Sequence, residues 1–98
     1  MSIQINGSTS GTVGESFELS CGVLGAENLN PSITYRWTKN TNGSQTQAGT
    51  DASTLSFTTI QLSDADNYSC IADVSSDYLT GSITAVASHS VTVQSKLL

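Results

Sequence analysis

Few side chains in this 98-residue chain could carry out chemistry, and the thiol and imidazole groups are the scarcest. The chain has two cysteines, Cys21 and Cys70, and one histidine, His89. Nucleophilic catalysis would need His89 as a base beside a serine, with an aspartate to orient the imidazole ring. His89 lies between Ser88 and Ser90 in a strand-like segment, and the chain lacks a Gly-x-Ser-x-Gly elbow. We therefore expect a solvated strand histidine and no enzymatic activity.

The acidic side chains offer a second kind of chemistry, metal binding. Asp64 and Asp66 suggest a pair of calcium ligands, but the spaced oxygen ligands of a calcium loop are missing around them. We predict no metal site and no cofactor. The net charge is −5 with only three basic residues, whereas phosphate-rich partners need a cationic surface. The sequence therefore predicts no nucleic-acid partner and no direct contact with anionic membranes.

The segments that carry these groups alternate like β-strands. Phe17, Leu19 and Cys21 fall on one face at a period of two, and Leu55 and Phe57 alternate with polar neighbours. Ser and Thr crowd the remaining positions, as on the solvated face of a sheet. A chain of this length supports one hydrophobic core, so we expect a single domain over residues 1–98 with its core over about residues 3–94.

The alternation and the turn signals give an order of elements. Strands are expected over residues 2–6, 15–23, 33–39, 44–48, 54–60, 67–74 and 83–94, with a loop or short edge strand over 49–53. The inward side chains should include Ile3, Ile5, Ile33, Tyr35, Trp37, Val91 and Val93. Gly7 to Gly14 is a Gly/Ser/Thr stretch where the first strand switches sheets. Asn42-Gly43 predicts an exposed turn, and residues 75–82 a hairpin tip.

One constellation narrows the fold further. Cys21 is followed by Trp37 and then by Tyr68, which lies two residues before Cys70. Three motifs in order, Gly14-x-x-Phe17-x-Leu19-x-Cys21, Tyr35-Arg36-Trp37 and Leu55-x-Phe57-x-x-Ile60-x-x-x-Asp64-x-x-x-Tyr68-x-Cys70, resemble successive strands of an immunoglobulin-superfamily domain. The resemblance covers nearly the whole chain, from about Ile3 to Val93.

The resemblance implies an all-β, two-sheet Greek-key sandwich with one inter-sheet disulfide between Cys21 and Cys70. It implies a core signature of Leu19, Trp37, Leu55, Asp64 and Tyr68. The Tyr68 hydroxyl should bond a backbone carbonyl a few residues upstream. A disulfide leaves no thiolates for zinc and implies an oxidising compartment, hence an extracellular location.

The chain departs from the family pattern at two positions. Asp66 stands where members usually have glycine, and we expect aspartate to tolerate the unusual backbone angles of that position. Asp64 lacks the arginine that often pairs with it in antibody-variable-type members, because no basic residue lies between Gly49 and Thr54. The spacing between the cysteines resembles the intermediate set, whereas the Leu24 to Ser32 loop and the long final hairpin resemble the variable set. An intermediate-set and a shortened variable-like domain both remain open.

Asparagine sequons also suggest an extracellular glycoprotein. Asn6, Asn42 and Asn67 each begin an Asn-x-Ser triplet and are candidate glycosylation sites. Chance alone produces such triplets in a chain this rich in Asn and Ser. Asn42 is the best candidate because it belongs to an expected turn, whereas packing near Tyr68 would restrict access to Asn67.

Binding should concentrate on loops and sheet faces. The first candidate is the hairpin tip with Asp77, Tyr78 and Leu79, because tyrosine is enriched in binding hot spots. An equally weighted alternative is that Tyr78 or Leu79 folds back and covers the open end of the sandwich. The second candidate is the outer sheet face that holds Arg36 and Lys39, which family members use for pairing; a merely solvated Arg36 is the plainer interpretation.

These features predict an extracellular, non-catalytic recognition or adhesion module of a cell-surface protein. The resemblance implies an adhesion receptor or the ectodomain of a receptor tyrosine kinase as parent. Protein partners, homophilic contacts or neighbouring immunoglobulin-like domains would be bound through loops or a sheet face. The alternatives are a structural spacer in a tandem array and a soluble defence or antigen-binding protein.

Overall fold

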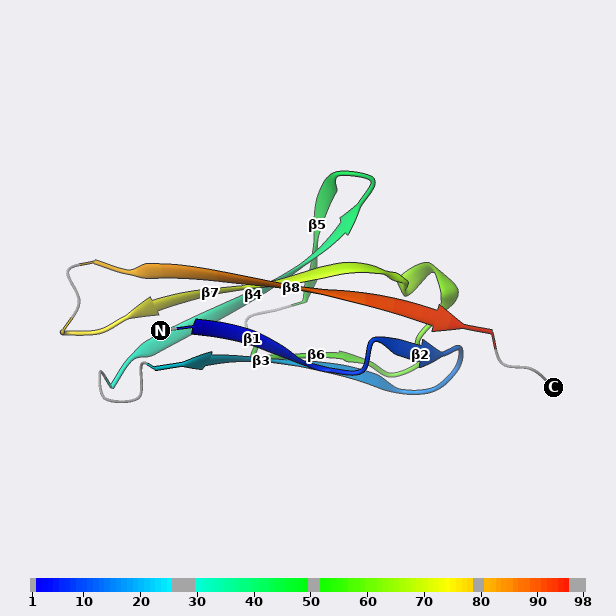
Figure 1. Ribbon diagram of the computed structural model, residues 1–98, viewed down its shortest axis with the longest axis horizontal. Helices are drawn as coiled ribbons and strands as arrows, with labels where there is room; N and C mark the ends of the chain where they lie inside the picture. The colour runs from blue at the N-terminus through cyan, green and yellow to red at the C-terminus, as the bar shows by residue number, and fades with distance from the viewer. Residues whose placement is uncertain (1, 26–29, 50–51, 79–80, 96–98) are drawn as a thin grey trace.

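The computed structural model describes residues 2–25, 30–49, 52–78 and 81–95. Its elements are β1 (Ser2–Gly7), β2 (Ser10–Thr12), β3 (Phe17–Leu24), β4 (Ser32–Thr41), β5 (Ser44–Gly49), β6 (Thr54–Phe57), the short 3-10 helix η2 (Leu62–Asp64), β7 (Asp66–Ser75) and β8 (Ile83–Gln94). The strands form a three-stranded sheet, β1-β3-β6, and a five-stranded sheet, β2-β8-β7-β4-β5 (Figure 1). Together with the Cys21–Cys70 disulfide, this confirms the predicted all-β two-sheet sandwich.

The first strand switches sheets between β1 and β2, as the Gly/Ser/Thr stretch predicted. β1 pairs antiparallel with β3, whereas β2 pairs parallel with β8 in the other sheet. Gly7 ends β1 with φ 154°, and a Cβ added there would lie 2.7 Å from a side-chain carbon of Leu19 and 3.0 Å from the Glu18 carbonyl oxygen. Only glycine fits where the chain leaves the first sheet so close to β3.

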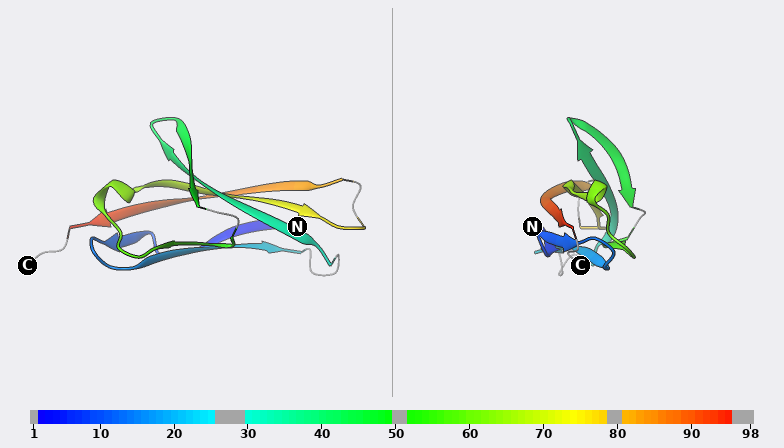
Figure 2. Two further views of the ribbon diagram at one scale, coloured as in Figure 1. Left: turned by 180° about the vertical axis from the view of Figure 1, so that it is seen from behind. Right: turned by 90° about the vertical axis from the view of Figure 1, so that its right-hand side faces the viewer.

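The β4–β5 hairpin forms one edge of the five-stranded sheet, and its turn end projects from the body of the sandwich, as Figures 1 and 2 show. Its two-residue turn has φ 51° at Asn42 and φ 83° at Gly43, the positive values that a tight antiparallel hairpin favours. The β4–β5 register shifts between Trp37 and Thr38, and such an irregularity increases local twist. The hairpin therefore leaves the plane of the sheet just beyond the core.

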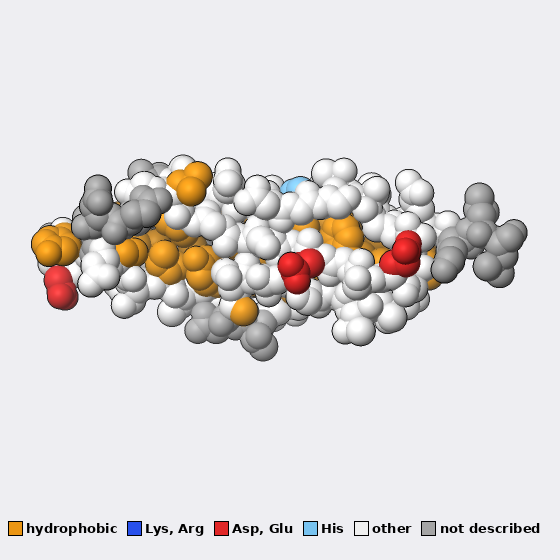
Figure 3. Space-filling view, turned by 90° about the horizontal axis from the view of Figure 1, so that it is seen from below, with side chains coloured by type: hydrophobic (Ala, Val, Ile, Leu, Met, Phe, Trp, Pro, Cys, Tyr) orange, Lys and Arg blue, Asp and Glu red, His pale blue; other side chains and the backbone are white. Residues whose placement is uncertain are grey.

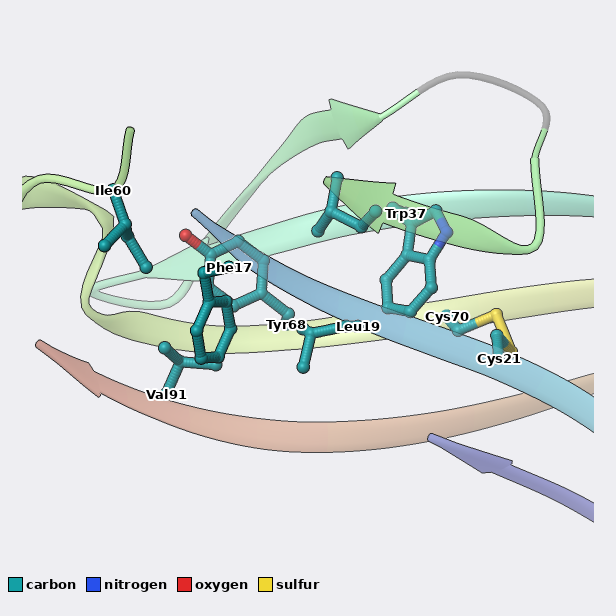
Figure 4. Packing of buried hydrophobic residues seen from close by; sticks show 9 residues of the cluster. Phe17, Leu19, Cys21, Trp37, Ile60, Tyr68, Cys70 and Val91 are labelled. Atoms are coloured by element: carbon teal, nitrogen blue, oxygen red, sulfur yellow. A yellow bond between two sulfur atoms is a disulfide. The ribbon is translucent and has the colours of Figure 1, made fainter. Parts of the chain in front are cut away.

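The core lies between the two sheets and is built from the predicted period-two positions. The large, fully buried side chains include Leu19, Trp37, Ile60 and Tyr68 (Figure 4). Phe17, Phe57 and Tyr68 form a chain of aromatic contacts, with ring centroids 6.0 Å and 5.8 Å apart. Tilted and edge-on pairs at such distances are favourable arrangements of aromatic rings.

The strand expected over residues 54–60 is shorter than predicted, because β6 ends at Phe57. Ile60 is nevertheless fully buried. Its backbone bonds the β2–β3 connection instead of a sheet neighbour: its N–H donates to the Glu15 carbonyl at 2.9 Å, and its carbonyl accepts from the Gly14 N–H at 2.9 Å. The apolar pattern of this segment therefore predicted the burial of Ile60 correctly, but it placed the end of the strand too far along the chain.

Candidate binding surfaces

The disulfide and Trp37 lie at the centre of the core and hold the two sheets together. Cys21 of β3 and Cys70 of β7 join the two sheets with their Cα atoms 6.4 Å apart. Trp37 is completely buried and lies opposite Cys70 in the β4–β7 register (Figure 4). Its indole N–H donates to the Ala52 carbonyl at 3.0 Å. The core thus also fixes part of the connection between β5 and β6.

Tyr68 fixes the corner where the chain crosses from β6 to β7. Its hydroxyl donates to the Asp64 carbonyl, and its ring is buried. The Asp64 carboxylate accepts a hydrogen bond from the Gln61 N–H at 2.8 Å, so this side chain caps η2. Burial, followed by the negative charges of Asp64 and Asp66, raises the pKa of the Tyr68 phenol to about 12.

The backbone explanation expected for Asp66 is wrong. Asn30 and Asn42 are the described non-glycine residues with positive φ, so Asp66 has an ordinary conformation. Its carboxylate instead accepts hydrogen bonds from the Thr41 hydroxyl at 2.6 Å and from the Asn67 N–H at 2.9 Å. These two bonds, with a smaller contribution from the Lys39 charge, lower the pKa of Asp66. Asp66 therefore ties the turn end of the β4–β5 hairpin to the start of β7.

The Tyr68 corner predicts loss of stability in alkali. The unfolded chain ionises tyrosine near pH 10, whereas the folded chain holds the Tyr68 proton until about pH 12. The unfolded state therefore loses this proton first, and the free energy of unfolding falls as pH rises above about 10. Urea unfolding across this range should show the decline.

Tyr68→Phe is the matched control for that prediction. It removes the titrating hydroxyl and the bond to Asp64, which lowers stability at neutral pH by about 1 kcal/mol, and the alkaline decline should become shallower. An equally steep decline in the variant would mean that another group causes it.

The β7–β8 end of the molecule presents the first predicted binding surface. Tyr78 has 75% of its surface exposed, so its ring does not fold back onto the open end of the sandwich. The Tyr78 N–H donates to the Ser76 hydroxyl at 3.2 Å, which fixes the chain just before the tip. Figure 3 shows hydrophobic side chains gathered toward this end of the molecule. The predicted contribution of Leu79 lies outside the described residues.

A polar cavity lies at the same end. Its volume is about 380 Å³, and its lining residues are Asn30, Ser32, Ser75, Ser76 and Asp77. Asn30 has a left-handed backbone with φ 48°, which is uncommon outside glycine. Among the described lining residues Asp77 is the charged one, and its carboxylate favours neutral or cationic chemistry in a ligand. The sequence indicated Asp77 but not the cavity, because the described lining residues come from two segments far apart in the chain.

The outer face of the five-stranded sheet presents the second surface. The registers place Arg36 of β4 beside Ile71 of β7, and Ile71 beside Val86 of β8. We call these three residues the outer row. Val86 has 57% of its surface exposed, and Arg36 is also exposed. Ile71 and Val86 were not among the predicted binding residues, although the alternation of Val86 with Ala85 and Ala87 in β8 indicates that Val86 faces outward.

Lys39 does not share this face with Arg36, contrary to expectation. The two residues are three positions apart along β4 and pair with Ile71 and Tyr68 of β7, so their side chains lie on opposite faces of the sheet. The Lys39 ammonium donates to the Ser63 carbonyl at 2.7 Å, beside η2. Lys39 therefore supports the corner, and the outer row contains a single cation.

His89 is more restrained than the predicted solvated histidine. The side chain is half-buried, and Nε2 donates to the Ser8 carbonyl at 3.1 Å. Ser88 bonds Ser69 on the opposite face of the strand at 3.1 Å. His89 thus links β8 to the β1–β2 connection, away from its neighbouring serine. Among the described residues no three potential metal-ligating side chains of His, Cys, Asp or Glu come together.

All three sequon asparagines have exposed side chains: Asn6 in β1, Asn42 in the hairpin turn and Asn67 in β7. The Asn67 side chain is exposed because it alternates with that of Tyr68 across β7, whereas Tyr68 and Ser69 of the same triplet are buried. Attachment of glycan at any of the three stays a prediction.

Comparison with known proteins identifies the family. A family model for the immunoglobulin domain matches residues 2–73, well over half of the chain. A search of curated protein sequences found no match. No helix in the described part of the chain is long and apolar enough to cross a membrane. Immunoglobulin domains generally lack catalytic activity, commonly mediate contacts between proteins and, when stapled by a disulfide, are typical of extracellular proteins. The match, the two sheets and the Cys21–Cys70 bond together show that the chain belongs to the immunoglobulin domain family.

Proposed function

We propose that residues 1–98 form one non-catalytic recognition or adhesion module in the extracellular part of a cell-surface protein, such as an adhesion receptor or a receptor tyrosine kinase. The disulfide supports the extracellular location, since such bonds persist in oxidising compartments. The exposed side chains of the three sequon asparagines are compatible with it. A spacer in a tandem array and a soluble defence protein are the competing functions.

The observation that carries this proposal is the exposure of Tyr78. Tyr78 has 75% of its surface exposed, so a partner that covers the ring removes apolar area from water. Because the tyrosine side chain has few rotatable bonds, fixing it on binding costs little conformational entropy. A spacer has no need of an aromatic ring at a hairpin tip, where it adds nothing to the core. The tip lies beside the polar cavity, so the two together offer an apolar anchor and hydrogen-bonding groups.

The charge of this end favours a partner with basic side chains. Asp77 lines the cavity, and the whole chain carries a net charge of −5. Opposite charges on two proteins accelerate their encounter and make it sensitive to salt. We therefore propose an association that weakens as ionic strength rises.

The outer row supports a second binding surface. Val86 is an exposed aliphatic side chain on a regular strand, flanked in register by Ile71 and Arg36. A flat apolar row with one guanidinium suits pairing between sheets of two copies or of two different domains. Sedimentation over a range of concentrations tests the homophilic form, and a strict monomer at high concentration would contradict it.

Binding of biotinylated domain, displayed as a streptavidin tetramer, to a panel of cell lines should separate the two surfaces. Tyr78→Ser should abolish binding and leave the free energy of unfolding within about 0.5 kcal/mol of the parent, because the side chain is exposed. Val86→Ser removes exposed apolar surface from the outer row and tests that second surface in the same assay.

The pattern of losses decides the outcome. Loss only with Val86→Ser would move recognition to the outer row. A tetramer that binds no cell type and no second copy would instead favour the spacer. A fall in the free energy of unfolding of more than about 2 kcal/mol in Tyr78→Ser would mean that the ring packs in the core, which would contradict its proposed role as an exposed anchor.

A further inference from the structure

The chain contains the same tripeptide twice, in opposite structural settings. Asn6-Gly7-Ser8 and Asn42-Gly43-Ser44 have identical local sequences, so any difference in their chemistry must come from the fold. Asparagine followed by glycine is the pair most open to attack on the side-chain amide by the next backbone nitrogen, because glycine has no Cβ to hinder it. The two sites therefore allow the effect of the fold on this reaction to be compared at identical local sequences.

The Asn42 site is open. Thr41 and Ser44 form the last pair of the β4–β5 ladder, and Asn42-Gly43 make up the turn beyond it. A Cβ built on Gly43 would have no atom within 4 Å outside the neighbouring residues. Asn42 is exposed, and the hairpin stands away from the sandwich (Figure 1). Water and hydroxide therefore reach the Gly43 amide without any opening of the structure.

The Asn6 site is exposed to solvent but lies within a strand ladder. Asn6 and Gly7 pair with Ser20 and Leu19 of β3. A Cβ on Gly7 would lie 2.7 Å from a Leu19 side-chain carbon and 3.0 Å from the Glu18 carbonyl oxygen, so β3 packs directly against this backbone. Ring closure here requires β1 to separate from β3, a local opening that carries its own free energy.

We propose that Asn42 is a site of spontaneous deamidation and isomerisation, and that the fold protects Asn6 from the same reaction. Base removes the Gly43 N–H proton, and the nitrogen attacks Cγ of Asn42. The N–Cγ bond forms, the Cγ–Nδ2 bond breaks, and Nδ2 leaves as ammonia with a proton from solvent. Water then opens the succinimide at either carbonyl, which gives aspartate or isoaspartate.

Both products change the hairpin. Aspartate adds a negative charge to residues 38–49, whose one charged side chain is that of Lys39. Isoaspartate inserts a methylene into the backbone of a turn whose strands meet directly at Thr41 and Ser44, so their pairing is disturbed. Nδ2 is also the atom to which an N-linked glycan would attach. A glycan at Asn42 would therefore hold the leaving nitrogen and preserve the turn.

The reaction is measured on unglycosylated folded domain held in mildly alkaline buffer. Cleavage after Arg36 and Lys39 separates the two tripeptides into different peptides, so mass spectrometry quantifies both sites in one reduced digest. Isoaspartyl methyltransferase labelling detects the isomerised product. We expect Asn42 to react at least about tenfold faster than Asn6, because only Asn6 must wait for local opening. Asn42→Gln should remove the products from that peptide.

Reduced, urea-unfolded chain is the control for the role of the fold. Both sites should react there at similar rates, so the preference for Asn42 should collapse. Equal rates in the folded domain would overturn the proposal. Protection of both sites in the folded domain, with reaction at both in the unfolded chain, would overturn it too, since the turn would then shield Asn42.

Discussion

Replacing Cys21 and Cys70 together with alanine is expected to lower the free energy of unfolding by about 4 kcal/mol. The bond closes a loop with a sequence separation of 49 residues, and the chain-entropy model assigns about 4 kcal/mol to a loop of that length. Natural domains unfold with only about 5–15 kcal/mol, so the variant should be close to the limit of folding. Urea denaturation at low temperature measures the difference in stability.

Reduction of the parent domain provides the matched measurement, because it breaks the same bond while leaving both side chains in the core. The reduced parent and the double alanine variant should lose similar stability, apart from the smaller volume of alanine. A loss below about 1 kcal/mol in both would contradict the chain-entropy estimate. It would also strengthen the spacer function, since a domain that does not depend on its disulfide suits a reducing compartment.

The core was predictable because burial on a strand has a period of two. Leu19, Leu55 and Trp37 follow from alternation alone, and the structure buries all three. Tyr68 required the resemblance as well, since its hydroxyl bond to Asp64 depends on how the chain turns between β6 and β7. These features depend on short stretches of sequence, which is why they can be predicted from one sequence.

The β4–β5 hairpin and its support were not predictable in the same way. Alternation predicted strands over residues 33–39 and 44–48, but the departure of the hairpin from the sheet depends on the register shift beyond Trp37. The Thr41–Asp66 bond joins residues far apart in the chain. The misassignments of Asp66 and Lys39 share this cause: each side chain finds a partner that only the folded chain brings near.

The binding surfaces were predictable in part. The exposure of Tyr78 shows that this ring does not fold inward, a point that the sequence left open because a polar hairpin tip is compatible with either orientation. The outer row was overlooked because an apolar residue in a strand is ordinarily assigned to the core. Residue pairing across β4, β7 and β8 is required to show that Ile71 and Val86 lie beside Arg36.

Trp37→Ala is expected to lower the free energy of unfolding by about 3–5 kcal/mol, the range for removing a large buried aromatic side chain. Trp37 has no exposed surface, and the strands around it are held by the disulfide. The core therefore has little freedom to collapse onto the space, which places the expected loss toward the upper end. Chemical denaturation with the disulfide intact measures it, and retained dispersion of amide resonances shows whether the variant still folds.

Trp37→Phe separates the contribution of volume from that of the hydrogen bond. Phenylalanine keeps most of the apolar contact but cannot donate to the Ala52 carbonyl, so the loss should be smaller than for alanine. The connection around Ala52 should also become more open, and hydrogen exchange at Cys21, whose N–H donates to the Ser53 carbonyl at 2.7 Å, should accelerate. Unchanged exchange at Cys21 would mean that the β5–β6 connection is held without the indole. In that case Trp37 would act through volume alone.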